Sequence, residues 1–201
     1  MIGIIDYGMG NLRSVQKALE NVGASTRIVT RLHDLEGVDK LVLPGVGAMK
    51  PAMERLEALK FVDAIRSFVA DGRPFLGICL GFQLLFDVSR EGGDVKGLGV
   101  LHGSVERFPD TVKVPQMGWN QLRIVQKDCL LCKGVKDGAF VYFAHSYYAK
   151  PDDLQVTATL TDYGFPYTSS VCRGNVWGVQ FHPEKSQAVG LRILENFVVC
   201  G

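Results

Sequence analysis

Cys79 stands in the segment GICLG at residues 77–81, with one glycine two positions before it and another two positions after it. An apolar run precedes this segment and a helical pattern follows it, so the sequence predicts a tight strand-to-helix turn that presents the cysteine above a sheet. The first N–H groups of the helix would point at the sulfur and favour the thiolate, which is the reactive form. A buried structural cysteine is the alternative, and the paired glycines argue against it.

His182 and Glu184 lie in the run QFHPE, directly after a predicted strand near the end of the chain. In α/β sheets functional residues gather at the carboxyl ends of strands, and a nucleophilic cysteine needs a group that handles protons. The carboxylate of Glu184 could orient the imidazole and stabilise its cation, with Pro183 stiffening the turn between them. A single histidine is more often a packing or surface residue, but the chain has only four, and this one is followed by Pro183, which stiffens the turn that holds the His/Glu pair. Together with Cys79 the pair predicts a Cys–His–Glu triad for acyl transfer.

These residues need a sheet to position them, and the pattern of the chain predicts one. Strands are expected at residues 2–7, 25–30, 40–44 and 74–79, and helices at 12–22, at about 49–69 and from Cys79 through Val88. This alternation favours a parallel sheet with helices on both faces. From about Gly97 short strands at 100–108, 120–125, 139–149 and 154–160 predict an antiparallel or mixed region. A strand at 176–181 leads to a last helix, with Ser186 as candidate N-cap, that runs through Phe197.

Length, composition and charge restrict the class of protein further. A chain of 201 residues with 47% hydrophobic and 21% charged residues predicts one globular α/β domain over residues 1–201. The formal net charge of +1 and the absence of a Lys/Arg block exclude the usual footprint of nucleic-acid or anionic-membrane binding. The short apolar start predicts neither a signal peptide nor a transmembrane span, and five scattered cysteines indicate free thiols. We therefore expect a cytoplasmic protein.

The motif GICLGFQ with a downstream FHPE resembles the class I, triad-type glutamine amidotransferases. More narrowly, the motifs DYGMGNLRSV, LPGVGA, VPQMGWN, AHSYY and VQFHPEKS, in this order and at these distances, resemble the glutaminase subunits of imidazole glycerol phosphate synthase. The resemblance covers almost the whole chain, and every triad position matches. It implies a flavodoxin-like α/β fold with a mixed, mostly parallel sheet flanked by helices and an additional antiparallel strand region.

The same resemblance implies a mechanism and a set of site residues. Cys79 would attack the carboxamide of glutamine, His182 would protonate the departing ammonia, and a glutamyl thioester would then be hydrolysed to glutamate. Backbone N–H groups of Leu80 and Gly47 would hold the oxyanion. The glutamine pocket would be formed by four residues: Gly45, Gln83, Ser146 and Tyr147. No cofactor and no metal are expected.

A partner subunit is also implied by the resemblance. Ammonia would pass to a cyclase subunit, a (β/α)₈ barrel in a heterodimer with this chain, which forms imidazole glycerol phosphate and an aminoimidazole carboxamide ribotide by-product in histidine biosynthesis. Asn11 and Lys185 are the interface candidates that the resemblance implies, although Lys185 could also be simply solvated. Trp119 is a third candidate, with core packing as its alternative. The glycines of the PGVGA loop would let the partner switch the glutaminase on. Two alternatives stay open: the glutaminase subunit of another complex, such as pyridoxal phosphate synthase, or a non-catalytic interaction subunit.

Several other signals carry no function in this interpretation. A dinucleotide fingerprint at Gly8 and Gly10 would need a glycine where Arg13 stands. The Asn11 side chain has a second explanation as a helix cap. Cys129 and Cys132 have the spacing of a metal or redox pair, but no second pair and no strand-to-helix turn accompany them, so we expect ordinary apolar residues. The remaining histidines are expected to be structural, although the last of them adjoins the predicted pocket: His33, His102 and His145.

Overall fold

The computed structural model describes residues 1–200, and a sheet of 12 strands runs through this part of the chain. Five neighbouring strands of this sheet are parallel, in the order β2-β1-β3-β4-β14. Their bounds are β1 (Ile2–Ile5), β2 (Thr26–Val29), β3 (Lys40–Gly45), β4 (Phe75–Cys79) and β14 (Val176–Val179). Buried apolar residues fill β1, β3, β4 and β14, as expected for strands covered on both faces.

Beyond β14 the pairing becomes mostly antiparallel, in the order β13-β11-β7-β5-β6. These strands are β5 (Phe86–Ser89), β6 (Val95–Lys96), β7 (Leu101–Arg107), β11 (Tyr147–Pro151) and β13 (Pro166–Arg173), and β12 (Thr157–Asp162) and β9 (Arg123–Ile124) extend from β13. A separate antiparallel pair consists of β8 (Gln116–Gln121) and β10 (Phe140–His145). The predicted antiparallel region is confirmed.

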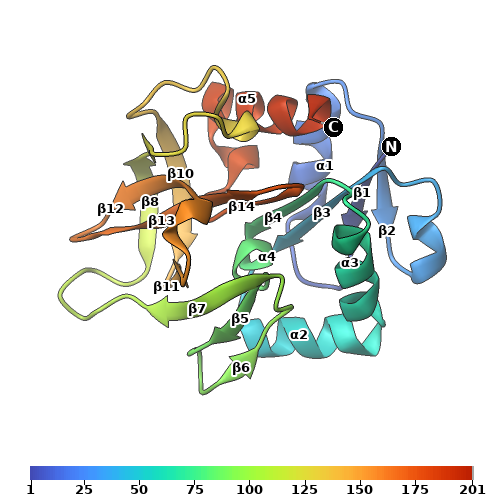
Figure 1. Ribbon diagram of the computed structural model, residues 1–201, viewed down its shortest axis with the longest axis horizontal. Helices are drawn as coiled ribbons and strands as arrows, with labels where there is room; N and C mark the ends of the chain where they lie inside the picture. The colour runs from blue at the N-terminus through green and yellow to red at the C-terminus, as the bar shows by residue number, and fades with distance from the viewer. Residues whose placement is uncertain (201) are drawn as a thin grey trace.

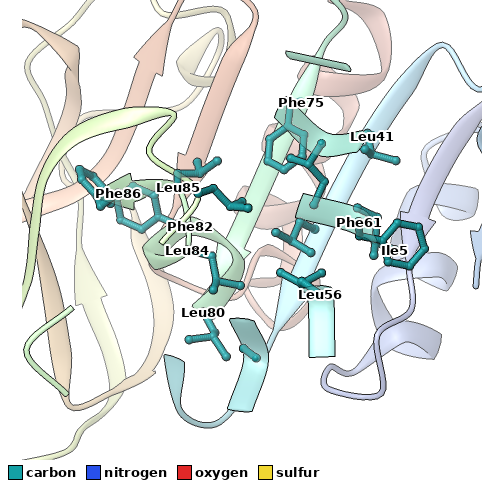
Figure 2. Packing of buried hydrophobic residues seen from close by; sticks show 14 of the residues in the cluster. Ile5, Leu41, Leu56, Phe61, Phe75, Leu80, Phe82, Leu84, Leu85 and Phe86 are labelled. Carbon is teal, nitrogen blue, oxygen red and sulfur yellow. The ribbon is translucent and has the colours of Figure 1, made fainter. Parts of the chain in front are cut away.

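Helices cover both faces of the parallel strands (Figure 1). On one face α1 (Leu12–Asn21) and α5 (Gln187–Val199) pack against each other and the sheet, and on the other lie α2 (Met49–Ala58) and α3 (Phe61–Ala70). Figure 2 shows the second layer, where Phe61 of α3 lies beside Ile5 of β1, and Leu56 of α2 and Leu41 of β3 belong to the same buried cluster. Short 3₁₀ turns complete the chain: η1 (Leu32–Leu35), η2 (Leu130–Cys132), η3 (Leu154–Val156) and η4 (Pro183–Lys185).

The prediction of a single helix at about 49–69 is wrong, because two helices, α2 and α3, meet at Lys60. This residue has left-handed backbone angles, φ 60° and ψ 23°, and its N–H donates to Glu57 O in the closing turn of α2. The apolar stripe continues across the break, since Leu56 and Phe61 are both fully buried. Periodicity therefore indicated helix correctly on both sides and gave no signal of the change in direction.

The helix expected from Cys79 through Val88 is also wrong in its length. Helix α4 covers only Leu80–Gln83, and the chain continues as β5, which pairs with β7. The carbonyls of Leu84 and Leu85 accept from backbone N–H groups of residues 98, 100 and 101, so an extended path satisfies groups that a helix would have bonded internally. A buried apolar run such as LLF fits both conformations, and tertiary pairing decided between them.

Candidate active site

The predicted turn at Cys79 is confirmed by the backbone. Cys79 ends β4 with φ 55° and ψ −109°, a conformation rare for a residue with a side chain, and α4 follows at once. A Cβ on Gly77 would lie 2.6 Å from the carbonyl oxygen of Gly81, and one on Gly81 would collide with the carbonyl of Leu43. The glycines are therefore required by close backbone approach, which lets the strained turn form and hold the thiol in place.

His182 and Glu184 lie together at the carboxyl end of β14, where the sequence placed them. His182 Nδ1 is 2.9 Å from Glu184 Oε1, and both side chains are almost fully buried. Since a carboxylate only accepts hydrogen bonds, Nδ1 carries the proton, and Nε2 is left for Cys79. The backbone N–H of His182 also donates to the carbonyl oxygen of Tyr142 across 2.9 Å, which fixes the turn against β10. The structure thus brings the three predicted residues into one triad.

The charge on His182 is held in place by its two partners. Burial disfavours the imidazolium, but the side-chain hydrogen bonds and charge interactions with Cys79 and Glu184 outweigh burial and raise the pKa of His182 to about 10. A histidine of this kind is protonated at neutral pH and can deliver a proton to a leaving group.

A chain of amides connects the nucleophile to the wall of the pocket. Gln83 Nε2 donates to Tyr147 O across 2.9 Å and to Gln180 Oε1 across 3.0 Å, and Gln180 Nε2 lies 3.8 Å from Cys79 Sγ. Gln83 therefore contributes by holding the backbone of Tyr147. Sequence reasoning missed Gln180, although its place two residues before His182 in the same strand-to-turn segment was a usable signal.

His145 supports the same carbonyl from the other side. Its Nδ1 lies 2.8 Å from Tyr147 O, and its Nε2 lies 3.2 Å from the hydroxyl of Tyr167. Burial lowers the pKa of His145 to about 4, so the ring is neutral at neutral pH and donates through Nδ1. The expected structural role agrees with these contacts, and its position beside the pocket is confirmed because it lines the cavity described next.

A cavity of about 350 Å³ opens in front of the triad. Eight of the residues named from the sequence line it: Gly47, Cys79, Leu80, Gln83, His145, Ser146, Tyr147 and His182. Lys185, named as an interface residue, lines it too. Sequence reasoning missed five others: Val46, Glu91, Pro115, Met117 and Ala144. Glu91 had no local signal, because it follows β5 in a polar loop whose position depends on pairing that the sequence did not show.

Gly47, on the loop after β3, and Leu80, at the start of α4, both lie beside the nucleophile, as the oxyanion prediction requires. Gly47 has φ 95°, so this peptide adopts a conformation closed to most other residues. Leu80 is the first residue of α4, and its N–H belongs to the unpaired first turn of that helix. Both residues line the cavity with Cys79, and their role as oxyanion donors stays a prediction.

Gly45 and Asn11 lie behind the triad and do not line this cavity. They line a much smaller cavity of about 10 Å³, together with His182 and Glu184. A Cβ on Gly45 would lie 2.9 Å from the Leu80 Cβ, so the glycine allows close packing beneath the strained strand-to-helix turn at Cys79, called the elbow below. Asn11 occupies the N-cap position of α1 without a side-chain capping bond, so its explanation as a helix cap is wrong.

Trp119 and Lys185 gather around one tyrosine, Tyr142, and of these three Lys185 lines the cavity. The Trp119 ring packs edge-on against Tyr142 with centroids 6.1 Å apart, and the Lys185 ammonium lies 5.8 Å from the centre of the same ring. Trp119 is 46% exposed. Exposed Met117 and Phe140 lie on the same two strands, so β8 and β10 present an apolar surface next to the pocket.

Comparison with known proteins identifies the class that this fold and site define. A family model described as "Glutamine amidotransferase class-I" matches residues 3–200, and the chain belongs to this family. A crystal structure of a glutamine amidotransferase superposes with a TM-score of 0.77 at 22% identity, covering 98% of this chain and 99% of the other, a likeness that shows the fold. The predicted flavodoxin-like fold of that class is confirmed.

Within the family, three similar relatives share one name. The chain is 53% identical over 195 residues to the imidazole glycerol phosphate synthase subunit HisH of Aquifex aeolicus (strain VF5), covering 96% of this chain and 94% of the relative. It is 50% identical over 197 residues to the subunit of the same name from Desulfitobacterium hafniense (strain DSM 10664 / DCB-2), covering 98% and 93%. The HisH subunit of Methanocaldococcus jannaschii is 48% identical over 198 residues, covering 98% of each chain.

Proposed function

We propose that this chain is the glutaminase subunit of an imidazole glycerol phosphate synthase, hydrolysing glutamine to glutamate and ammonia. The observation that carries the proposal is the triad itself: Cys79 on a strained elbow, with His182 and Glu184 in hydrogen-bond contact and an open cavity in front of them. Membership of the class-I amidotransferases and about 50% identity to HisH subunits support it.

The geometry accounts for each step of the hydrolysis. The Cys79 sulfur attacks the side-chain carbonyl carbon, and the developing oxyanion takes hydrogen bonds from the N–H groups of Gly47 and Leu80. The protonated His182 delivers its proton to the nitrogen as the C–N bond breaks, and ammonia leaves. Neutral His182 then takes a proton from the water that attacks the thioester, and glutamate and the Cys79 thiol are released. Glu184 holds the ring in one tautomer throughout.

The cavity offers charges that match a zwitterionic amino acid. Glu91 and Lys185 both line it, so a carboxylate is available for the α-ammonium group and an ammonium for the α-carboxylate. Glu91 is held by the backbone N–H of Met49, which donates to its Oε2 across 2.8 Å and leaves Oε1 for a ligand. We propose Glu91 as a substrate-binding residue in addition to Gln83, Ser146 and Tyr147.

A cyclase subunit is the proposed partner and the consumer of the ammonia. The relatives are named as subunits of a synthase, so each of them works in a complex. The apolar surface of Met117, Trp119 and Phe140 adjoins the mouth of the cavity, which suits a partner that receives a small neutral product without its escape to water. We place the interface there, with Lys185 at its edge and a (β/α)₈ barrel as the partner. Asn11, which lines the small cavity behind the triad, stays a separate interface prediction.

Two further parts of the proposal concern domain organisation and location. Residues 1–201 would act as one glutamine amidotransferase domain, which the family match over residues 3–200 supports. We propose a cytoplasmic location. Within the described residues the structure contains no helix that combines the length and apolar character needed to span a membrane.

The test is glutamate and ammonia release from glutamine by wild type and Cys79→Ala, each with and without a cyclase subunit and its phosphoribulosyl formimino substrate. We expect turnover by wild type, stimulated by the cyclase, and none above background by Cys79→Ala. Formation of imidazole glycerol phosphate from glutamine distinguishes this complex from pyridoxal phosphate synthase. If a glutamine-analogue electrophile fails to label Cys79 even in the complex, the chain is a non-catalytic subunit and the proposal is wrong.

A further inference from the structure

Three free thiols meet outside the active-site cavity, on the side of the sheet that α5 covers. Cys129 directly precedes the turn η2, Cys132 is the last residue of that turn, and Cys172 lies on β13. Cys129 belongs to one apolar cluster, and Cys132 and Cys172 both pack against that cluster. The expectation that Cys129 and Cys132 are ordinary apolar residues leaves this shared environment unexplained.

The backbone holds Cys129 and Cys132 in a geometry that a disulfide can bridge. The N–H of Cys132 donates to the carbonyl of Cys129 across 2.9 Å, which closes a turn of four residues. Such turns bring their end Cα atoms within about 7 Å, and in a 3₁₀ turn side chains three apart lie on one face. Disulfides span Cα distances of about 4.4–6.8 Å. The pair can therefore close with little movement of the chain.

The two thiols of the turn differ in the way that a redox pair requires. Cys132 is partly exposed, whereas Cys129 is buried. A hydrogen bond from the Cys129 thiol lowers the pKa of Cys132, and the same contact is the largest cause that raises the pKa of Cys129 to about 12. Cys132 is thus the thiol that meets solvent and ionises first, and Cys129 stands behind it as a resolving thiol.

The turn is tied to the helix that begins at the triad. Asn196 of α5 donates through Nδ2 to Leu131 O across 2.9 Å and to Lys133 O across 2.8 Å. The turn packs under α5, where the yellow segment lies beside the red helix in Figure 1. Among residues 1–200 no group of three or more His, Cys, Asp or Glu side chains is arranged to hold a metal ion, so the cysteines are not placed as a metal site.

We propose that Cys132 and Cys129 form a reversible dithiol–disulfide site that takes hydrogen peroxide as its oxidant. The Cys132 thiolate attacks the peroxide, a sulfur–oxygen bond forms, the O–O bond breaks, and the leaving oxygen departs as water after taking a proton. The Cys129 sulfur then attacks Cys132, the S–S bond forms, and a second water leaves. Two thiols are oxidised by two electrons and the peroxide is reduced to two waters. A small dithiol reduces the disulfide back to two thiols and is itself oxidised to a disulfide. The site is independent of the proposed glutaminase activity.

The test is peptide mapping of the full chain after mild hydrogen peroxide treatment. The Cys79→Ala variant is used, so that the catalytic thiol does not consume oxidant or form mixed disulfides. Trypsin cuts after Lys127 and Lys133, so one fragment, Asp128–Lys133, carries both cysteines, and Cys172 lies in another. We expect this fragment to lose two hydrogens and to resist alkylation, and to recover both thiols after dithiothreitol. Cys172→Ser should leave this result unchanged, and Cys132→Ser should abolish it.

Three outcomes would overturn the assignment. Both thiols could stay alkylatable at peroxide concentrations that oxidise Cys79 in the wild-type chain. A disulfide could join the fragment with Cys172 to Asp128–Lys133, which would make Cys172 the partner. Cys132 could pass to its sulfinic acid while Cys129 stays free, which would show that Cys129 does not resolve it.

Discussion

Ser186 donates through Oγ to the carbonyl oxygen of His182 across 2.6 Å, and the same Oγ accepts from the N–H of Tyr142 across 2.9 Å. The hydroxyl therefore joins the triad turn to strand β10. The residue was expected to cap α5, but its side chain makes no capping bond with that helix. Its hydrogen bonds instead position His182, the proposed catalytic histidine.

Ser186→Ala should reduce turnover because the turn loses its anchor and the Tyr142 N–H loses its acceptor. We expect kcat to fall by between about tenfold and 10²-fold, since small displacements of a catalytic group have effects of that size, with little change in KM. The free energy of unfolding should fall by about 1–3 kcal/mol, because the buried N–H of Tyr142 is left without an acceptor. Ser104→Ala, which removes a hydroxyl bonded to Glu106 on β7, is the control and should leave kcat unchanged. Equal effects of the two variants on kcat would contradict this role.

Glu184→Gln should change both the rate and its pH dependence. The His182 imidazolium is present below its pKa of about 10 and is lost as the pH rises through that value, so activity should fall on the alkaline side. Without the carboxylate the pKa of His182 falls, so the alkaline fall in activity should move to lower pH. We expect kcat to drop by about 10²- to 10⁴-fold, because the imidazole is no longer held in the tautomer that carries its proton on Nδ1. Steady-state rates measured across pH give the apparent pKa of the alkaline fall in activity. This value belongs to the coupled Cys79–His182 pair. An unchanged apparent pKa would contradict the part assigned to Glu184.

His145 should make the fold sensitive to acid. Its pKa lies at about 4 in the fold and at its ordinary value of 6.5 in the unfolded chain, so between these values the unfolded state binds the extra proton. The neutral His145 ring makes its full contribution to the free energy of unfolding above pH 6.5. This contribution, about 3 kcal/mol, is lost as the pH falls toward 4. Denaturant unfolding of wild type and His145→Gln across this range should show a smaller slope in the variant. If the free energy of unfolding falls with pH equally steeply in wild type and in His145→Gln, then His145 is not the group that makes the fold sensitive to acid.

Sequence predicted the triad, the elbow and the parallel strands because each depends on short local patterns. The paired glycines around Cys79 and the strand before His182 are examples. The sequence did not predict the length of α4 or the break at Lys60, because a buried apolar run fits helix and strand alike and a left-handed lysine has no signature. Glu91 was missed because its place in the pocket depends on the pairing of β5 with β7.

Gly81→Ala should disrupt the elbow, because the new methyl group would collide with the carbonyl of Leu43, and backbone cannot yield as a flexible side chain would. We expect loss of glutamine hydrolysis and a large drop in thermal midpoint. The matched control is Gly72→Ala, at a turn with φ 77° and nothing within 4 Å of the added atom, which should cost about 1 kcal/mol and retain activity. A fully active, stable Gly81→Ala protein would mean that the close approach in the elbow is not needed.

Trp119→Ala should weaken binding of the cyclase subunit more than it changes the chain alone. A half-exposed tryptophan packed on Tyr142 has the character of an interface anchor, and removing such anchors raises Kd by about 10- to 10²-fold. Calorimetric titration of the cyclase measures Kd, and Leu154→Ala, which removes an exposed apolar side chain on η3, serves as control. Because stimulation by the cyclase depends on docking, the concentration needed for half-maximal glutaminase activity should rise in parallel with Kd. Unchanged binding by Trp119→Ala together with weakened binding by Leu154→Ala would move the interface away from β8 and β10.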